Sequence, residues 1–185
     1  MMLEQWKNKQ EKTMNPYEKC PTVKSKNFTF RLITKEDSDS IFECYHDKKA
    51  VAFMNDDNCD FGFYVDSKEQ MSKTVSYWLD FYKQGAFIRF AVVDNTTEKA
   101  IGTVEGFGGE VGVLRIDISS SYEKETYIAE ILDFAKANFY DYFGNKCLVT
   151  KAIPSTKERR SALEKNGWEF IDKFRDYRDY YKISL

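Results

Sequence analysis

A strand-like run leads straight into a helix-like run in the middle of the chain, and their junction has the chemistry to bind an anion. The strand pattern "VGVLRIDI" covers residues 111–118, and "SSSYEKETYIAEIL" follows over residues 119–132. Backbone N–H groups and the helix dipole point outward at such a junction, where they can hold a phosphate. Lys124 and Thr126 add a cation and a hydroxyl to the site, and further cations follow at Lys157, Arg159 and Arg160.

The same junction has a second interpretation, because it lacks glycine and carries Glu123 and Glu125. Ser120 and Glu123 have the spacing of a capping box. Acidic side chains in a first helical turn interact favourably with the helix dipole, by about 0.3–1 kcal/mol each. In this interpretation the protein's own carboxylates take the place of the phosphate, and the junction is only a capped helix start.

Hydrophobic periodicity predicts the elements that position this junction. Strands are expected at residues 28–33, 87–93, 100–107, 111–118 and 147–153, with a closing hairpin at residues 168–174 and 177–185. Helices are expected after the caps Thr34 and Ser67 and over residues 121–143 and 155–166. Glycine ends three of these helices, at Gly85, Gly144 and Gly167.

The order of elements is therefore β-α-α-β-β-β-α-β-α-β-β, which places the chain in a mixed α/β (α+β) class. Residues 26–185 are expected to form a single domain. Residues 1–25 are expected to be an N-terminal extension, with a short helix around Leu3–Lys12.

Composition argues against several functional classes. Twenty-eight basic and thirty acidic residues give a net charge of −2, which argues against a nucleic-acid-binding protein. No apolar run approaches the length of a membrane span, so no membrane partner is expected. Four cysteines without a CxxC pair and the single His46 predict reduced thiols in a cytoplasmic protein, with no zinc or other metal site.

The order of elements and three phrases together resemble the GNAT family of acetyl-CoA-dependent N-acetyltransferases, in particular the ribosomal-protein acetyltransferase branch. The phrases are "FTFRLITKEDSDSIFECYHDKKAVAFM", "RFAVVDNTTEKAIGTVEGF" and "RRSALEKNGWEFI", and the resemblance runs from about Lys26 to Leu185. It implies a mostly antiparallel sheet of six to seven strands flanked by helices. It also implies acetyl-CoA as co-substrate, direct attack by a primary amine of a small molecule or protein N-terminus, and a monomer or homodimer.

The resemblance also implies where the coenzyme lies. In the family, a Gln/Arg-x-x-Gly-x-Gly/Ala loop wraps the pyrophosphate, and the fourth strand contacts the coenzyme where it splays from the fifth. That loop falls on residues 123–128, where the glycines and the leading Arg or Gln are missing. The family's Asn and Tyr positions fall on Thr156 and Leu163. The expected coenzyme-binding residues are Ile116, Ile118, Lys124, Glu125, Thr126, Tyr127, Ile128, Thr156 and Arg159.

Amine acetylation calls for a base, an acid and a backbone N–H for the oxyanion. Glu105 and Asp117 are the expected bases, because both fall on central strands near the splay. For Asp117 an internal ion pair with Arg115 is the alternative. Leu163 replaces the family's usual proton donor, and Tyr122, Tyr127 or Ser119 could substitute for it. The acidic loop "NDDNCD" (55–60) either attracts a cationic amine or is simply solvated.

The sequence is consistent with three functions. The first is an acyl-CoA-dependent N-acetyltransferase whose junction amides stay open to the coenzyme. The second is a GNAT-fold binding or regulatory module that has lost coenzyme A binding. The third is an accessory protein associated with nucleic acid, which the charge balance disfavours.

Overall fold

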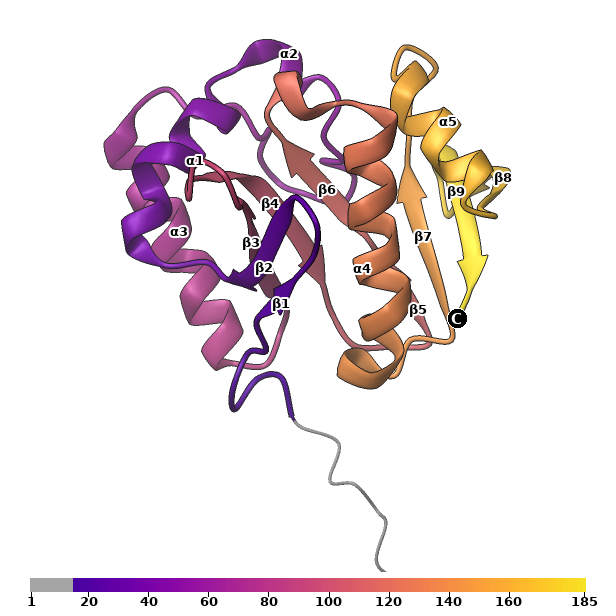
Figure 1. Ribbon diagram of the computed structural model, residues 1–185, viewed down its shortest axis with the longest axis horizontal. Helices are drawn as coiled ribbons and strands as arrows, with labels where there is room; N and C mark the ends of the chain where they lie inside the picture. The colour runs from indigo at the N-terminus through magenta and orange to yellow at the C-terminus, as the bar shows by residue number, and fades with distance from the viewer. Residues whose placement is uncertain (1–14) are drawn as a thin grey trace, which may run out of the picture.

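The computed structural model describes residues 15–185, which form two sheets joined through one split strand (Figure 1). The five-stranded sheet has the order β1 (Val23–Lys24), β2 (Phe28–Leu32), β3 (Ile88–Asp94), β4 (Ala100–Gly106) and β6 (Arg115–Ile118). The four-stranded sheet has the order β5 (Val111–Val113), β7 (Cys147–Lys151), β9 (Tyr177–Ser184) and β8 (Glu169–Phe174). The short helix expected around Leu3–Lys12 lies outside the described residues.

Helices cover both faces of the five-stranded sheet. On one face α1 (Ser38–Tyr45), α2 (Lys48–Val51) and α3 (Lys68–Lys83) form a core with inward residues such as Ala91 and Val93. On the other face α4 (Glu125–Phe143) covers Phe30, Phe90 and Ile116. The last helix, α5 (Lys157–Lys165), packs beside α4 and next to the four-stranded sheet (Figure 1).

Local capping signals explain where several helices begin and end. Thr34 precedes the 3₁₀ turn η1 (Lys35–Asp37) and forms a reciprocal capping box with Asp37. The Ser67 side chain accepts a hydrogen bond from the Gln70 N–H at 3.2 Å, which opens α3 as predicted. Gly144 ends α4 in the left-handed conformation, with φ of 70°.

The strand expected over residues 111–118 is in fact two strands that separate at Leu114. The Leu114 N–H donates to the Val149 carbonyl at 2.8 Å, and the Thr150 hydroxyl donates to the Leu114 carbonyl at 2.8 Å. Before this point β5 pairs in parallel with β7, and after it β6 pairs antiparallel with β4. Strands β6 and β7 therefore diverge beyond Leu114, at the splay that the sequence resemblance implies.

The start of α4 also differs from the expected one. Residues 120–122 form a separate 3₁₀ turn, η2, and α4 begins at Glu125 after Lys124, which provides no side-chain cap. The capping box expected between Ser120 and Glu123 is therefore wrong. The mixed, mostly antiparallel architecture is confirmed, with nine strands in the described residues in place of six to seven.

Candidate functional site

The front of α4 has most of its backbone donors already satisfied. The Glu125 N–H donates to Oε2 of Glu158 at 2.8 Å, and Glu158 lies in the first turn of α5. The N–H groups of Lys124, Tyr127 and Ile128 donate to backbone carbonyls of the preceding turn. Four of the five amides of residues 124–128 thus have acceptors within the protein. The open row of donors expected from the sequence is not present.

A buried ion pair closes the same junction from the side. Arg159 on α5 is 1% exposed and pairs through Nε and Nη2 with the carboxylate of Glu123, whose side chain is 7% exposed. Its Nη1 donates to the Phe53 carbonyl, beyond the end of α2, at 3.1 Å. Arg159 therefore ties α5 to the α4 junction and to the chain that leaves α2. Because Glu123 has this partner, it does not cap α4.

Glu125 is held by α5 as well. Its carboxylate accepts hydrogen bonds from Lys165 at 2.7 Å and from the Ser161 hydroxyl at 2.6 Å. The hydrogen bond from Lys165 is the main reason that the pKa of Glu125 is lowered. Both acids of the junction thus have cationic partners on α5.

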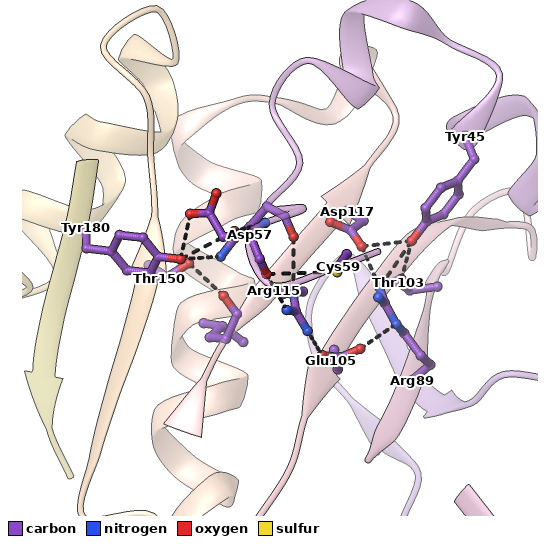
Figure 2. A network of polar contacts seen from close by, with 12 residues as sticks. Tyr45, Asp57, Cys59, Arg89, Thr103, Glu105, Arg115, Asp117, Thr150 and Tyr180 are labelled. Carbon is purple, nitrogen blue, oxygen red and sulfur yellow. Dashed lines mark hydrogen bonds and ion pairs between the residues drawn. The ribbon is translucent and has the colours of Figure 1, made fainter. Parts of the chain in front are cut away.

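The segment 53–57 lies where β6 and β7 diverge, and polar contacts join it to both strands. Figure 2 shows Asp57 of this segment between Arg115 and Tyr180. Arg115 on β6 donates to the carbonyls of Asn55 at 3.1 Å and Asp57 at 3.0 Å. On the other side, the Asp57 carboxylate pairs with Lys151 of β7 at 2.7 Å and accepts a hydrogen bond from Tyr180 of β9 at 2.9 Å. Asn55 itself is 2% exposed.

The two carboxylates expected to act as bases are both paired with arginine. Arg89 on β3 contacts Asp117 through Nη1 at 2.5 Å and Glu105 through Nε at 2.9 Å. Arg115 pairs with the other oxygen of Glu105. Asp117 has an ion pair, as the alternative interpretation proposed, but its partner is Arg89 and not Arg115. The Tyr45 hydroxyl also donates to Asp117, at 2.8 Å (Figure 2).

These contacts form one charge network, which we define as Tyr45, Asp57, Arg89, Glu105, Arg115, Asp117, Lys151 and Tyr180. It contains three acids and three bases, so the buried charges balance. Burial raises the pKa of Tyr45 well above its usual value, and the negative charge of Asp117 raises it further. Burial opposes the charge of Arg89, but Glu105 and other neighbours outweigh it and raise the pKa of Arg89. The tyrosine is therefore neutral and the arginine charged at neutral pH.

The candidate proton donors Tyr122 and Tyr127 lie on the α4 side of the five-stranded sheet. The Tyr122 hydroxyl donates to Asp94 at 2.6 Å, and burial together with this hydrogen bond raises the pKa of Tyr122 to about 12. The Tyr127 ring packs against Phe28, with ring centroids 5.4 Å apart. Ser119 donates its hydroxyl proton to the Ile101 carbonyl.

The remaining expected coenzyme-binding residues are spread between core and surface. Thr156 is buried, and its hydroxyl donates to the Ile153 carbonyl at 2.7 Å. Lys124, which precedes α4, and Thr126 in its first turn are both exposed. Three side chains face the core beneath α4, namely those of Ile116, Ile118 and Ile128.

Two cavities border helices that precede β3 in the chain, the first against α3 and the second against α1. One, of about 800 Å³, is bounded by α3, residues 58–65 and part of the charge network: Tyr45, Arg89, Glu105 and Arg115. The other, of about 910 Å³, includes Arg31, Asp37, Ser119 and Tyr122 in its lining. Neither of these two cavities is lined by the junction residues 123–128.

Within residues 15–185 no three His, Cys, Asp or Glu side chains gather in a way that could hold a metal ion. Over the same residues no helix combines the length and apolar character needed to cross a membrane. The four cysteines are free thiols.

Sequence reasoning identified Glu105, Asp117 and Arg159 but missed Arg89, Glu158, Asn55 and Lys151. Arg89 had a usable signal, because it interrupts the apolar strand "FIRFAVV" and a charge inside a strand requires a partner. Glu158 had none, since its acceptor role depends on how α5 lies against α4. Asn55 and Lys151 likewise gain their roles only from the divergence of β6 and β7.

Comparisons with known proteins show which solved structures share this fold. No family model matches the chain, and no curated protein sequence matches it. Among solved structures, RimJ of Mycobacterium smegmatis in complex with CoA-disulfide has a TM-score of 0.73 at 11% identity, covering 93% of this chain and 90% of that one. A ribosomal-protein-serine acetyltransferase from Vibrio cholerae has a TM-score of 0.66 at 12% identity, covering 93% and 100%.

A third solved structure is a GNAT-family acetyltransferase from Bacillus anthracis, with a TM-score of 0.65 at 14% identity, covering 89% of this chain and 98% of that one. All three matches extend over most of both chains. Identities this low establish the architecture and leave the chemistry to be argued from the residues. The protein has the fold of the GNAT acetyltransferases.

Proposed function

We propose that this protein is a GNAT-fold ligand-binding module whose coenzyme site is filled by its own side chains. The observation that supports this most directly is the buried Arg159. It pairs with Glu123 at the junction and reaches the Phe53 carbonyl across the divergence of β6 and β7. In the family resemblance, residues 123–128 wrap the pyrophosphate of coenzyme A. Here Glu158 and Glu123 supply the negative charge at that place.

The energetic cost of admitting a coenzyme supports the same proposal. A pyrophosphate at the α4 amides would displace Glu158 and separate Glu123 from Arg159. A buried ion pair that loses one partner costs about 3–5 kcal/mol. A site of micromolar intrinsic affinity, about −8.2 kcal/mol, would then bind with a dissociation constant of roughly 0.2–5 mM.

Titration with acetyl-CoA tests the proposal. We expect a dissociation constant in calorimetry of about 0.2 mM or weaker, so that 1 mM acetyl-CoA raises the melting temperature by about 4 °C at most. A dissociation constant of about 100 µM, or −5.5 kcal/mol, would instead stabilise the fold at 1 mM by about 1.4 kcal/mol. For a chain of this size that stabilisation corresponds to a shift of about 3–6 °C. An affinity of that strength or tighter contradicts the proposal.

A second candidate is an acyl-CoA-dependent N-acetyltransferase acting in the cytoplasm on a primary amine of a small molecule or a protein N-terminus. It is favoured by the divergence of β6 and β7 after Leu114, where the family resemblance places the coenzyme. In this case Arg159 would turn toward the pyrophosphate, with Lys124 and Thr126 beside it. Glu105 or Asp117 would accept a proton from the amine, and Tyr122 or Tyr127 would protonate the thiolate.

One variant separates the two candidates. Thr126 is exposed on the first turn of α4, so Thr126→Glu adds charge at the junction without disturbing the core. The second candidate expects acetyl-CoA binding by the native chain and its loss in this variant. The ligand-binding proposal expects neither protein to bind acetyl-CoA more tightly than about 0.2 mM.

A further inference from the structure

The cavity of about 800 Å³ beside α3 has aromatic walls that are open to solvent. Tyr77 and Phe81 of α3 are 66% and 43% exposed, and Phe61, in the segment 58–65 that also lines the cavity, is 83% exposed. Trp78 and Phe63 are less exposed, and both rings lie close to the Arg89 guanidinium. Large aromatic side chains that converge on one concave surface favour a flat ligand that stacks between them.

The floor of this cavity presents a hydrogen-bond donor with no internal acceptor. The Cζ atom of Arg89 lies 4.7 Å from the Trp78 ring centroid and 5.7 Å from that of Phe63. Arg89 Nε and Nη1 contact Glu105 and Asp117. Among residues 15–185, neither Arg89 Nη2 nor Trp78 Nε1 has a hydrogen-bond acceptor. Both donors are available to a molecule in the cavity.

Two side-chain amides add further donors. The Gln70 oxygen accepts from the Asp66 N–H at 3.0 Å, and the Asn58 oxygen accepts from the Tyr177 hydroxyl at 3.1 Å. These contacts use only the oxygens, so the NH₂ group of each amide remains available as a hydrogen-bond donor. The acceptor side is poorer, because both oxygens of the Glu105 carboxylate already contact arginine. Asp60 is the other acid of the lining.

From this excess of donors we propose that the cavity binds a small planar molecule that carries a carboxylate. The flat body would stack against Tyr77 and Trp78, and the carboxylate would accept from Arg89 Nη2. A carboxylate is favoured over a neutral carbonyl because its negative charge adds a Coulomb attraction to the Arg89 guanidinium, which a neutral carbonyl lacks. A cationic amine would have to approach the guanidinium groups of Arg89 and Arg115, and the Glu105 carboxylate of the lining already contacts both of them.

This inference rests on the proposed ligand-binding role and names the ligand class, but it is tested at a different place in the molecule. Acetyl-CoA titration addresses the α4 junction, whereas the experiment below uses no coenzyme. Binding of acetyl-CoA would overturn the proposed function and leave the cavity result unaffected. Failure of the cavity experiment would overturn this inference and leave the internally filled junction in place.

Three probes with the same indole ring and different side-chain charges provide the test: indole-3-acetate, indole-3-acetamide and tryptamine. Calorimetry on the native chain should give a submillimolar dissociation constant for indole-3-acetate. Its affinity should exceed that of indole-3-acetamide by at least threefold and that of tryptamine by at least tenfold. Equal or tighter binding of the amide or the amine overturns the proposal, and so does the absence of binding by all three probes at 5 mM.

Variants locate the binding. Tyr77→Ser removes an exposed aromatic ring from the cavity lining and should weaken the binding of indole-3-acetate about three- to tenfold. Tyr140→Ser is the matched control, because Tyr140 is 58% exposed on α4 and does not line the cavity. It should leave the affinity unchanged. Equal effects of the two substitutions overturn the assignment to this cavity.

Arg89→Lys keeps a cation for Asp117 and Glu105 but removes Nη2. The preference for indole-3-acetate over indole-3-acetamide should therefore disappear. Because Arg89 belongs to the charge network, this variant could fail to fold. Backbone amide shifts of the native chain on adding indole-3-acetate are therefore measured as well. They should concentrate in residues 58–65 and in α3, and changes centred elsewhere overturn the proposal.

Discussion

Replacing Arg159 with methionine tests whether the α4 junction is held by a buried ion pair. Arg159 and the Glu123 side chain are 1% and 7% exposed, so water cannot compensate for the loss of either partner. Arg159→Met leaves the Glu123 carboxylate buried without its cation, a change that costs about 3–5 kcal/mol. In a protein of 150–250 residues this lowers the melting temperature by about 6–20 °C.

The ion pair itself is measured by a double-mutant cycle. Glu123→Gln combined with Arg159→Met removes both charges, so the double variant should be more stable than the sum of the two single changes predicts. The expected coupling energy is about 2–3 kcal/mol, at the upper end for residues in contact. Equilibrium unfolding in urea at pH 7, followed by circular dichroism, gives the four free energies of unfolding.

A matched control uses the same two helices. Glu125 and Lys165 also join α4 to α5, but the Lys165 side chain is 65% exposed. Solvent screens such a pair, so the cycle on Glu125→Gln and Lys165→Met should give a much smaller coupling energy. If the Glu123–Arg159 cycle is instead additive, the pair is not what fills the junction. Arg159 would then be free to meet a phosphate, and the argument against coenzyme binding would fail.

Three further predictions concern the framework around the site. Glu130 on α4 accepts hydrogen bonds from Ser25, Asn27 and the Phe28 N–H, so Glu130→Ala should lower the free energy of unfolding by about 1–3 kcal/mol. Asp133 on the same helix is exposed, so Asp133→Ala should change the free energy of unfolding by less than about 0.5 kcal/mol. If urea unfolding shows similar losses for the two variants, the role of Glu130 is contradicted. Burial raises the pKa of Asp37, but Arg31 and the Thr34 N–H outweigh it and the net pKa is lowered. Its stabilisation is therefore present above the unfolded pKa of about 3.9 and lost as pH falls below it, so Asp37→Asn should flatten the loss of stability between pH 5 and 2. A Cβ at Gly102 would lie 2.1 Å from the Asp117 carbonyl oxygen, so Gly102→Ala should separate β4 from β6 and lower the melting temperature by several degrees, which a thermal melt would detect.

Much of the architecture was predictable because its signals are local. The Thr34–Asp37 box, the Ser67 cap and the glycines after each long helix depend on residues only a few positions apart. Alternating strands joined by short turns fix antiparallel neighbours in the same way. The order of elements could therefore be matched to a known fold through the sequence alone.

The division of residues 111–118 into β5 and β6 was not predictable from that segment. Both halves have the same strand pattern, and the break at Leu114 is set by hydrogen bonds with Val149 and Thr150, more than thirty residues later. The start of α4 was misplaced for a similar reason. Ser120 and Glu123 have a suitable capping spacing, but Glu123 instead pairs with Arg159, 36 residues further along the chain.

The candidate site shows the same limit at the level of charge. Asp117 and Glu105 are recognisable as acids on central strands, and a functional base would have the same sequence pattern. In the structure both carboxylates pair with arginine, which their own sequence pattern does not show. Arg89 was the readable sign, since an arginine in the middle of an apolar strand implies an acid nearby. Its relation to Trp78 and Phe63 required the packing of α3 on the sheet.

Glu158 explains how a helix start without glycine stays satisfied without a bound phosphate. The first amides of a helix need acceptors, and the helix dipole favours a negative one. Glu158 lies in the first turn of α5 and accepts the Glu125 N–H of α4, so one carboxylate serves the N-terminal ends of two helices. A coenzyme phosphate could replace this carboxylate at α4 only by moving an acid that α5 also uses. In the proposed function, the missing glycines and the internal anion therefore belong to one arrangement, in which side chains of α5 take the place of a ligand.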